Sequence, residues 1–203
     1  MKLSKIIISA GHGTKAGADQ GAEGFGTTEG KFVAAFRADL VIELNKELAA
    51  VSTAVLSTKP IVVTDPDAYA LKETLAYLKG KTDADSLCID LHLNSTDKQT
   101  VKGTEVLVPF DASAVEVEIA DKLSDIIGEV LGTPERGNFK GKDGVRSEDE
   151  SQHSRLGWMR IAGHNILIEL DFISNPDAMT ILKSKQKTLC QRFAQYVVGL
   201  LKK

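Results

Sequence analysis

The 203-residue chain is short of cysteine, of surplus positive charge and of long apolar runs, and each shortage excludes a class of protein. Its two cysteines are Cys88, within an apolar run, and Cys190, within a helical pattern. Because both lie in apolar patterns, we expect two reduced thiols in the core rather than a disulfide or a metal-binding pair. Apolar stretches such as residues 6–8 fall far short of the roughly 20 residues that span a bilayer, so no membrane span is expected.

The balance of charge argues against a polyanionic partner. The chain has 28 acidic and 25 basic residues, which leaves a formal charge of −3. No overall positive field is present to hold nucleic acid or an anionic membrane surface. We therefore expect no nucleic-acid partner.

The hydrophobic pattern predicts one α/β domain over residues 1–203. Because apolar strands alternate with amphipathic helices, we expect a three-layer sandwich, with a mostly parallel twisted sheet and helices on both faces. The strands are expected at residues 5–10, 61–64, 86–93, 103–109 and 166–170. The helices are expected at residues 29–50, 65–79 and 113–130, followed by a short helix from residue 175 and a closing helix to residue 200.

Capping residues and glycines mark the boundaries between these elements. Asp65 and Pro66 predict the start of one helix, and Ser113 with Glu116 has the spacing of a capping box. The glycine-rich residues 11–26 and the roughly 25 residues from 132 to 157 are expected to be loops without elements of their own. Loops of this kind are candidate parts of a functional site.

Four residues of metal-ligand type are predicted to meet at one edge of the sheet. His12 follows the first strand, and His92 alternates with Asp90 along one face of the strand at 86–93. Glu169 lies within an apolar strand, and Glu29 begins the first helix. Functional groups of open α/β sheets gather beyond the carboxyl ends of the strands, where these residues fall.

Two imidazoles and a carboxylate form a known catalytic zinc set, because three protein ligands leave the fourth tetrahedral position to water. A further carboxylate would take the proton of that water, and Glu169 suits this role. Taken singly, the residues have simpler explanations: His12 as part of a turn, His92 as a polar strand edge and Glu29 as a charge favourable at a helix start. Glu169 is the exception, since burial of a carboxylate is costly unless something holds or uses it.

Four separated motifs resemble one family. They are I-I-I-S-A-G-H-G at 6–13, G-A-E-G at 21–24 followed by Glu29, D-L-H-L-N-S at 90–95, and I-L-I-E-L-D-F-I-S-N-P at 166–176. In order and spacing they are similar to those of the type 3 zinc-dependent N-acetylmuramoyl-L-alanine amidases, over about residues 5–200.

The resemblance implies a zinc ion held by His12, Glu29 and His92, with Glu169 as the catalytic carboxylate. It also implies the substrate, the amide between the lactyl group of N-acetylmuramic acid and L-alanine in peptidoglycan or a muropeptide. We expect a monomer. Because no secretory signal is visible, we expect synthesis in the cytoplasm and action on the cell wall, as for a phage or prophage endolysin. A secreted enzyme whose signal had been removed would look the same.

Three positions depart from the family's usual residues. Asp90 stands where Ser is common, Asp171 where Gly is common, and Asp65 where an Arg is common. Asp90 is either a partner that orients the His92 imidazole or a solvated edge residue. Asp171 flanks Glu169, whose pKa a neighbouring carboxylate could raise.

The other candidate residues have a structural and a functional interpretation. His153 and His164 are expected at the surface, although either could contact substrate or replace Glu29 as a ligand. Arg136, Arg146 and Arg155 are expected to be solvated, with contact to stem-peptide carboxylates as the alternative. Trp158 is expected in the core rather than as a platform for a sugar.

Two other functions are compatible with the same sequence. A zinc exopeptidase would also place its metal at the carboxyl edge of such a sheet. A non-catalytic module that binds the cell wall would keep the fold without turnover, although all four site positions are filled here. The products formed from muropeptides separate these possibilities.

Overall fold

A six-stranded sheet runs through the middle of this computed structural model, which describes residues 1–52, 55–56, 58–151 and 155–202. The strand order is β4-β1-β5-β10-β6-β9, and all neighbours are parallel except the antiparallel pair β10 and β6. The predicted α/β class with a mostly parallel sheet is confirmed. The strands of this sheet are β1 (Lys5–Ser9), β4 (Ile61–Thr64), β5 (Ser86–Asn94), β6 (Glu105–Val108), β9 (Val145–Ser147) and β10 (His164–Phe172).

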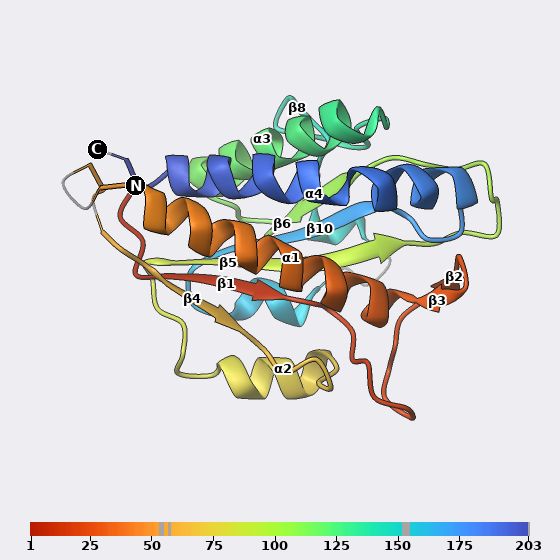
Figure 1. Ribbon diagram of the computed structural model, residues 1–203, viewed down its shortest axis with the longest axis horizontal. Helices are drawn as coiled ribbons and strands as arrows, with labels where there is room; N and C mark the ends of the chain where they lie inside the picture. Colours follow the sequence, from red (N-terminus) through yellow and green to blue (C-terminus); the bar gives the residue numbers. More distant parts are fainter. Residues whose placement is uncertain (53–54, 57, 152–154, 203) are drawn as a thin grey trace.

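Helices cover both faces of the sheet (Figure 1). On one face lie α1 (Glu29–Ala50), α3 (Ala114–Leu131) and α4 (Pro176–Gly199). On the other face lie α2 (Leu71–Leu78) and the 3₁₀ turn η2 (Gly157–Arg160). Two short hairpins, β2 (Glu23–Gly24) with β3 (Thr27–Thr28) and β7 (Asn138–Phe139) with β8 (Lys142–Asp143), and the 3₁₀ turn η1 (Glu148–Glu150) complete the described elements.

The side chains of β5 alternate between the two faces of the sheet and so pack in two different apolar clusters. Leu87, Ile89 and Leu91 are fully buried in the core beneath α1, α3 and α4. Cys88 points to the opposite face and packs in a second apolar cluster that includes Trp158. Successive side chains of a strand point to opposite faces, so Asp90 and His92 lie on the Cys88 side. The predicted core position of Trp158 is confirmed.

The helix predicted to begin at Pro66, with Asp65 as its N-cap, begins five residues later, at Leu71. The Asp65 carboxylate does not cap a helix, because it accepts hydrogen bonds from Arg37 of α1 at 2.6 Å and from Thr74 at 3.2 Å. Both Arg37 and Asp65 are buried. A partner distant along the chain therefore displaced the local capping interaction that the sequence favoured.

The two segments expected to be loops contain short strands. Residues 21–28 form the β2–β3 hairpin that leads into α1. Within residues 132–157, β9 joins β6 as the edge of the main sheet and β7 pairs with β8. These strands are two or three residues long, too short for a periodic pattern to be visible in the sequence.

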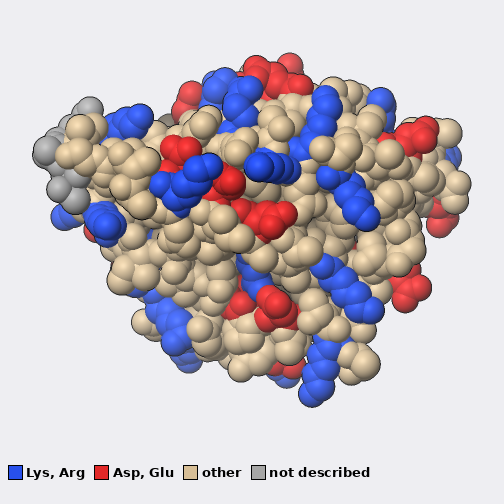
Figure 2. All heavy atoms as spheres, viewed as in Figure 1, with Lys and Arg blue, Asp and Glu red and all other residues tan. Residues whose placement is uncertain are grey.

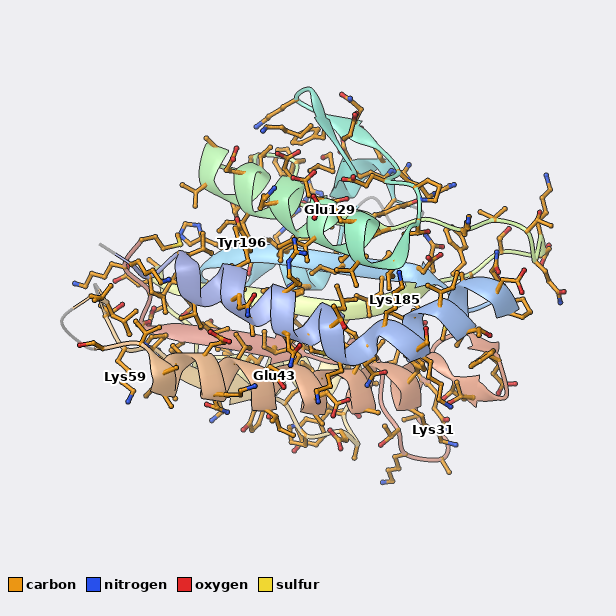
Figure 3. The ribbon with its side chains drawn as sticks, turned by 45° about the horizontal axis from the view of Figure 1, so that its top comes forward. Lys31, Glu43, Lys59, Glu129, Lys185 and Tyr196 are labelled. Carbon is orange, nitrogen blue, oxygen red and sulfur yellow. The ribbon has the colours of Figure 1, made fainter. Side chains whose placement is uncertain are left out.

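The two carboxy-terminal helices expected from the sequence are one continuous helix, α4, which Asn175 caps at its start. Figure 3 shows α4 between α1, which carries Glu43, and α3, which carries Glu129. Polar contacts join α4 to both neighbours: Arg192 pairs with Glu129 at 3.0 Å and Gln186 donates to Asp39 of α1 at 2.7 Å. These polar residues lie on the outer part of a helix whose apolar residues enter the core.

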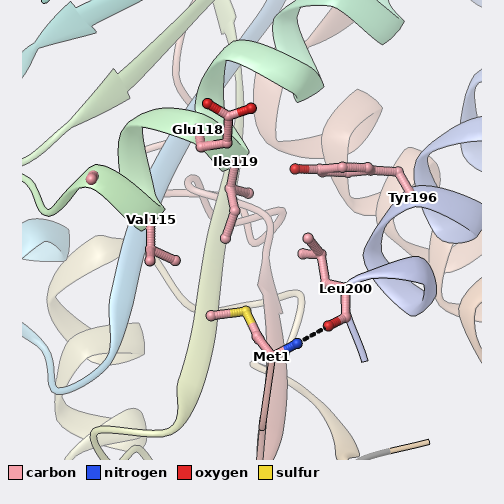
Figure 4. A pocket seen from close by; sticks show the side chains of 7 residues that line it. Met1, Val115, Glu118, Ile119, Tyr196 and Leu200 are labelled. Carbon is pink, nitrogen blue, oxygen red and sulfur yellow. Dashed lines mark hydrogen bonds between the residues drawn. The ribbon is translucent and has the colours of Figure 1, made fainter. Parts of the chain in front are cut away.

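The two chain ends meet at the amino ends of the strands, far from the β2–β3 hairpin (Figure 1). There the amino group of Met1 donates to the Leu200 carbonyl beside an apolar cavity of about 380 Å³, lined by side chains that include Ile119 and Tyr196 (Figure 4). Lys and Arg alternate with Asp and Glu over the face shown in Figure 2. Among the described helices, none combines the length and apolar character needed to cross a membrane.

Candidate metal centre

The first turn after β1 and the first turn of α1 bring two predicted ligands together. His12 follows Gly11, whose φ of 51° allows the chain to turn sharply after the strand. Glu29 is the first residue of α1, and the side chain of its N-cap Thr28 accepts a hydrogen bond from the Lys31 N–H. Glu29 is 4% exposed although it begins a helix, so its carboxylate points inward rather than to solvent.

His12, Glu29 and His92 form a compact cluster. Oε1 of Glu29 lies 2.9 Å from Nδ1 of His92 and 3.5 Å from Nε2 of His12. The imidazoles meet edge to face, with ring centroids 5.0 Å apart. One candidate ligand atom from each of the three residues lies within 4.8 Å of the others. The structure thus brings the three predicted ligands together.

Neighbouring charges shift the pKa values of Glu29 and His92 in opposite directions. Burial alone would raise the pKa of Glu29, but the hydrogen bond from His92 and the charges of His92 and His12 lower it. Burial alone would lower the pKa of His92, but the charge and hydrogen bond of Asp90, together with Glu29, raise it well above its ordinary value.

Glu169 lies beside His92, its register partner in the neighbouring parallel strand. Paired residues of adjacent strands share a face of the sheet, so the two side chains point the same way. Burial, with smaller contributions from the charges of Glu29, Glu105 and Asp90, raises the pKa of Glu169 to about 8, although the charge of His92 opposes this. Its Oε2 is buried and has no hydrogen-bond partner among the residues that the structure describes.

Two further carboxylates lie close to the imidazoles, one beside each ring. Asp90 Oδ2 lies 3.1 Å from Nε2 of His92, and Asp90 is completely buried. Asp19, whose side chain is 69% exposed, lies 3.3 Å from Nδ1 of His12. Sequence reasoning missed Asp19, because it stands in the glycine-rich segment without a strand or helix pattern.

A second group missed by sequence reasoning adjoins Glu169 on β6. Glu105 is the antiparallel register partner of Glu169 and is 4% exposed. Its carboxylate accepts from Arg136 Nε at 2.7 Å and from Arg146 Nη1 at 2.9 Å. The sequence predicts solvated arginines here, yet each is tied to a buried acid beside the candidate centre. The signal available in the sequence was an acid next to the apolar residues of a strand: Glu105 begins β6, and Glu169 lies within β10.

The donor set fits a zinc ion. Zinc takes imidazole nitrogen and carboxylate oxygen at about 2.0–2.2 Å, so ligands of a tetrahedral ion lie roughly 3.4 Å apart. The separations of 2.9 Å and 3.5 Å from Glu29 Oε1 to the two imidazoles lie on either side of this value. Nitrogen and oxygen donors without thiolate suit zinc better than magnesium or calcium, which prefer oxygen ligands alone.

The other predicted candidates lie elsewhere or have structural partners. His164 begins β10 opposite Leu87, at the amino end of the sheet and away from the cluster. Asp171 accepts hydrogen bonds from two backbone N–H groups, those of Gly103 and Phe172, both at 2.8 Å. Arg155 is exposed. His153 lies outside the described residues.

Comparisons with known proteins agree on one family and one fold. A family model described as N-acetylmuramoyl-L-alanine amidase matches residues 6–198. An amidase structure from Clostridium difficile 630 is 20% identical with a TM-score of 0.67, covering 99% of this chain and 98% of that one. The catalytic domain of the CD27L endolysin, which targets C. difficile, is 23% identical with a TM-score of 0.66 and 97% coverage of both chains.

A third solved structure, from Neisseria meningitidis, is provisionally described as an N-acetylmuramoyl-L-alanine amidase and is 23% identical to this chain, with a TM-score of 0.62. The match covers 98% of this chain and 97% of the N. meningitidis chain. No curated protein sequence matches the chain. At these identities the solved structures establish the shared fold, and the family model establishes the family.

Proposed function

The chain belongs to the N-acetylmuramoyl-L-alanine amidase family. We propose that it cleaves the amide bond between N-acetylmuramic acid and L-alanine in peptidoglycan with a zinc ion held by His12, Glu29 and His92. The family match over residues 6–198 shows the enzyme class, an amidase acting on the cell wall. The observation that supports the metal site is Glu29 Oε1, which lies between the imidazole nitrogens of His12 and His92.

Zinc bound there would supply a Lewis acid that lowers the pKa of a water molecule to about 7 and polarises the scissile carbonyl. The protein's own residues account for the rest. Glu29 is held in place by the Leu93 N–H, which donates to its Oε1 at 3.0 Å. His92 is held by Asp90, so two of the three ligands have partners that fix their orientation.

Glu169 is proposed to move the proton. Its carboxylate takes the proton of the attacking water and donates it to the leaving amine nitrogen of L-alanine as the amide C–N bond breaks. Burial raises the pKa of Glu169 to about 8, close enough to neutral pH for its carboxyl group both to accept and to donate a proton. The free Oε2 is available for this transfer, because no described residue occupies it.

We expect Glu169→Ala to keep zinc and to lower kcat by roughly 10²- to 10⁴-fold, the usual contribution of general acid–base catalysis. The measurement combines metal analysis of the purified variant with turnover of a defined muropeptide. Metal content equal to that of the unaltered protein is the control. A variant that lost its zinc would identify Glu169 as a ligand and overturn its assignment as the proton carrier.

Mass spectrometry of the muropeptide products tests the bond that is cut. Release of the intact stem peptide with unmodified glycan supports the amidase. Free amino acids would indicate an exopeptidase on the same scaffold, and binding to insoluble cell wall without any product would indicate a non-catalytic module. Either of the last two results would contradict the proposal.

We also propose that residues 1–203 act as one catalytic domain and as a monomer, in the manner of an endolysin made in the cytoplasm. The endolysin catalytic domain among the structural neighbours supports this mode of action.

Light scattering of the purified chain tests the oligomeric state. Lysis of cells on expression of the protein together with a pore-forming holin, but not without it, tests the route to the wall.

A further inference from the structure

We propose that Asp90 is a positioning residue that fixes the proton of His92 on Nε2, so that His92 binds the metal through Nδ1. The inference rests on the proposed zinc site and assigns which nitrogen of His92 faces the metal.

The contacts of Asp90 are specific to this role. Its Oδ2 lies 3.1 Å from Nε2 of His92, two residues further along the same face of β5. Its Oδ1 accepts the Gly11 backbone N–H at 2.8 Å, directly before His12. One fully buried carboxylate therefore joins the strand that carries one ligand to the turn that carries another.

The position of the proton follows from the two sides of the ring. A neutral imidazole has one N–H donor and one lone pair, and a carboxylate can only accept. Once a metal takes the side of the ring that faces Glu29, the N–H lies on Nε2, where Asp90 accepts it, and the Nδ1 lone pair is left for the metal. Nδ1 is also the nitrogen that lies 2.9 Å from Glu29 Oε1, on the side of the other ligands.

Burial makes the arrangement energetically significant. The side chains of Asp90 and His92 are 0% and 13% exposed, so water competes little for their hydrogen bond. By contrast, the side chain of Asp19 beside His12 is 69% exposed, and its interaction is weakened by solvent. The two imidazoles are therefore held unequally, and His92 is the ligand with a fixed orientation.

The direct test uses the unaltered protein loaded with zinc or with cadmium-113. Long-range ¹H–¹⁵N NMR spectra should show the metal on Nδ1 of His92 and a proton on Nε2. Coordination through Nε2 would overturn the inference while leaving the zinc site itself intact. Failure of the unaltered protein to bind zinc at all would instead overturn the proposed function, so the two failures are distinguishable.

Asp90→Asn supplies the second test. We expect its zinc affinity, measured by competition with a chelator, to fall by about 10- to 100-fold, the usual effect of removing such a partner. The amide can turn either its oxygen or its NH₂ group toward His92, so the protein also loses its single tautomer. An affinity within about twofold of the unaltered protein would contradict the proposal.

Asp171→Asn is the matched control. Asp171 is also a buried acid, 1% exposed, but its hydrogen bonds come from backbone N–H groups rather than from an imidazole. We expect this variant to keep its zinc affinity within about twofold. An equal loss in both variants would show that any buried charge at this edge matters, and would contradict a specific role for Asp90. Asp90→Ser keeps a hydrogen-bond acceptor without the charge, so its zinc affinity should lie between those of Asp90→Asn and the unaltered protein.

Discussion

At the scale of single residues, the candidate centre depends on how closely the backbone approaches the ligands. Gly11 has a positive φ of 51°, and a Cβ atom there would collide with Cε1 and Nε2 of His92. At Gly21, whose φ is 71°, a Cβ atom would likewise collide with the side chains of Glu29 and His12. Glycine is therefore required here for space as well as for backbone conformation.

We predict that Gly11→Ala weakens zinc binding by at least about tenfold, because the methyl group displaces the His92 ring from its place between Asp90 and Glu29. Gly17→Ala is the control, since Gly17 also has a positive φ, 82°, but a methyl group there would meet no other part of the described chain within 4 Å. Both changes should cost about 1 kcal/mol of stability for the backbone conformation. Chelator competition and urea unfolding separate the two effects. Equal zinc affinity in both variants would contradict the steric argument.

At the scale of elements, helix starts place the functional and structural groups. The capping box of α3 satisfies the Glu116 N–H with the Ser113 side chain and the Ser113 N–H with the Glu116 carboxylate. The second Glu116 oxygen accepts the backbone N–H of Asn165 at 3.0 Å, so the helix start is tied to β10, the strand that carries Glu169. A local signal in the sequence thus also fixes a tertiary contact.

Ser113→Ala should lower the free energy of unfolding by about 1 kcal/mol through loss of the cap. Ser184→Ala is the control, because the exposed Ser184 hydroxyl only donates to the Ile181 carbonyl within α4. That change should alter stability by less than about 0.5 kcal/mol. Urea titrations followed by circular dichroism measure both. A cost for Ser113→Ala no larger than for Ser184→Ala would show that the cap contributes little.

At the scale of the whole molecule, the sheet separates two apolar layers, and each contains one cysteine. Cys88 packs with Trp158 on the α2 side, while Cys190 of α4 lies in the core on the opposite face. Both thiols are free and buried. Burial raises the pKa of each to about 12, so neither is ionised at neutral pH.

Native protein at pH 8 is therefore expected to react with a thiol reagent extremely slowly, and unfolded protein to expose two reactive thiols. The native thiols react slowly because their pKa is raised, so the reactive thiolate becomes populated only as the pH approaches about 12. Because both layers share the sheet, the two thiols should become reactive together across a urea titration. Exposure of one thiol well before the other would show that the layers unfold separately.

The sequence alone determined the elements whose signals are local. Apolar runs located β1, β4 and β5, the three- and four-residue spacing located α1 with its observed ends, and the capping box located the start of α3. Such patterns succeed because a strand or helix must bury one face wherever it packs. The four-residue candidate set followed from the same strand ends, although the roles of its members stay predictions.

Tertiary structure decided what depends on partners distant along the chain. Asp65 bonds Arg37 rather than capping α2, β9 exists because β6 offers it an edge, and Glu105 binds two arginines from a segment expected to be loop. The same holds for Asp90, whose choice between solvent and His92 was open in the sequence. A buried polar group must find a partner, and only the folded chain determines which one is within reach.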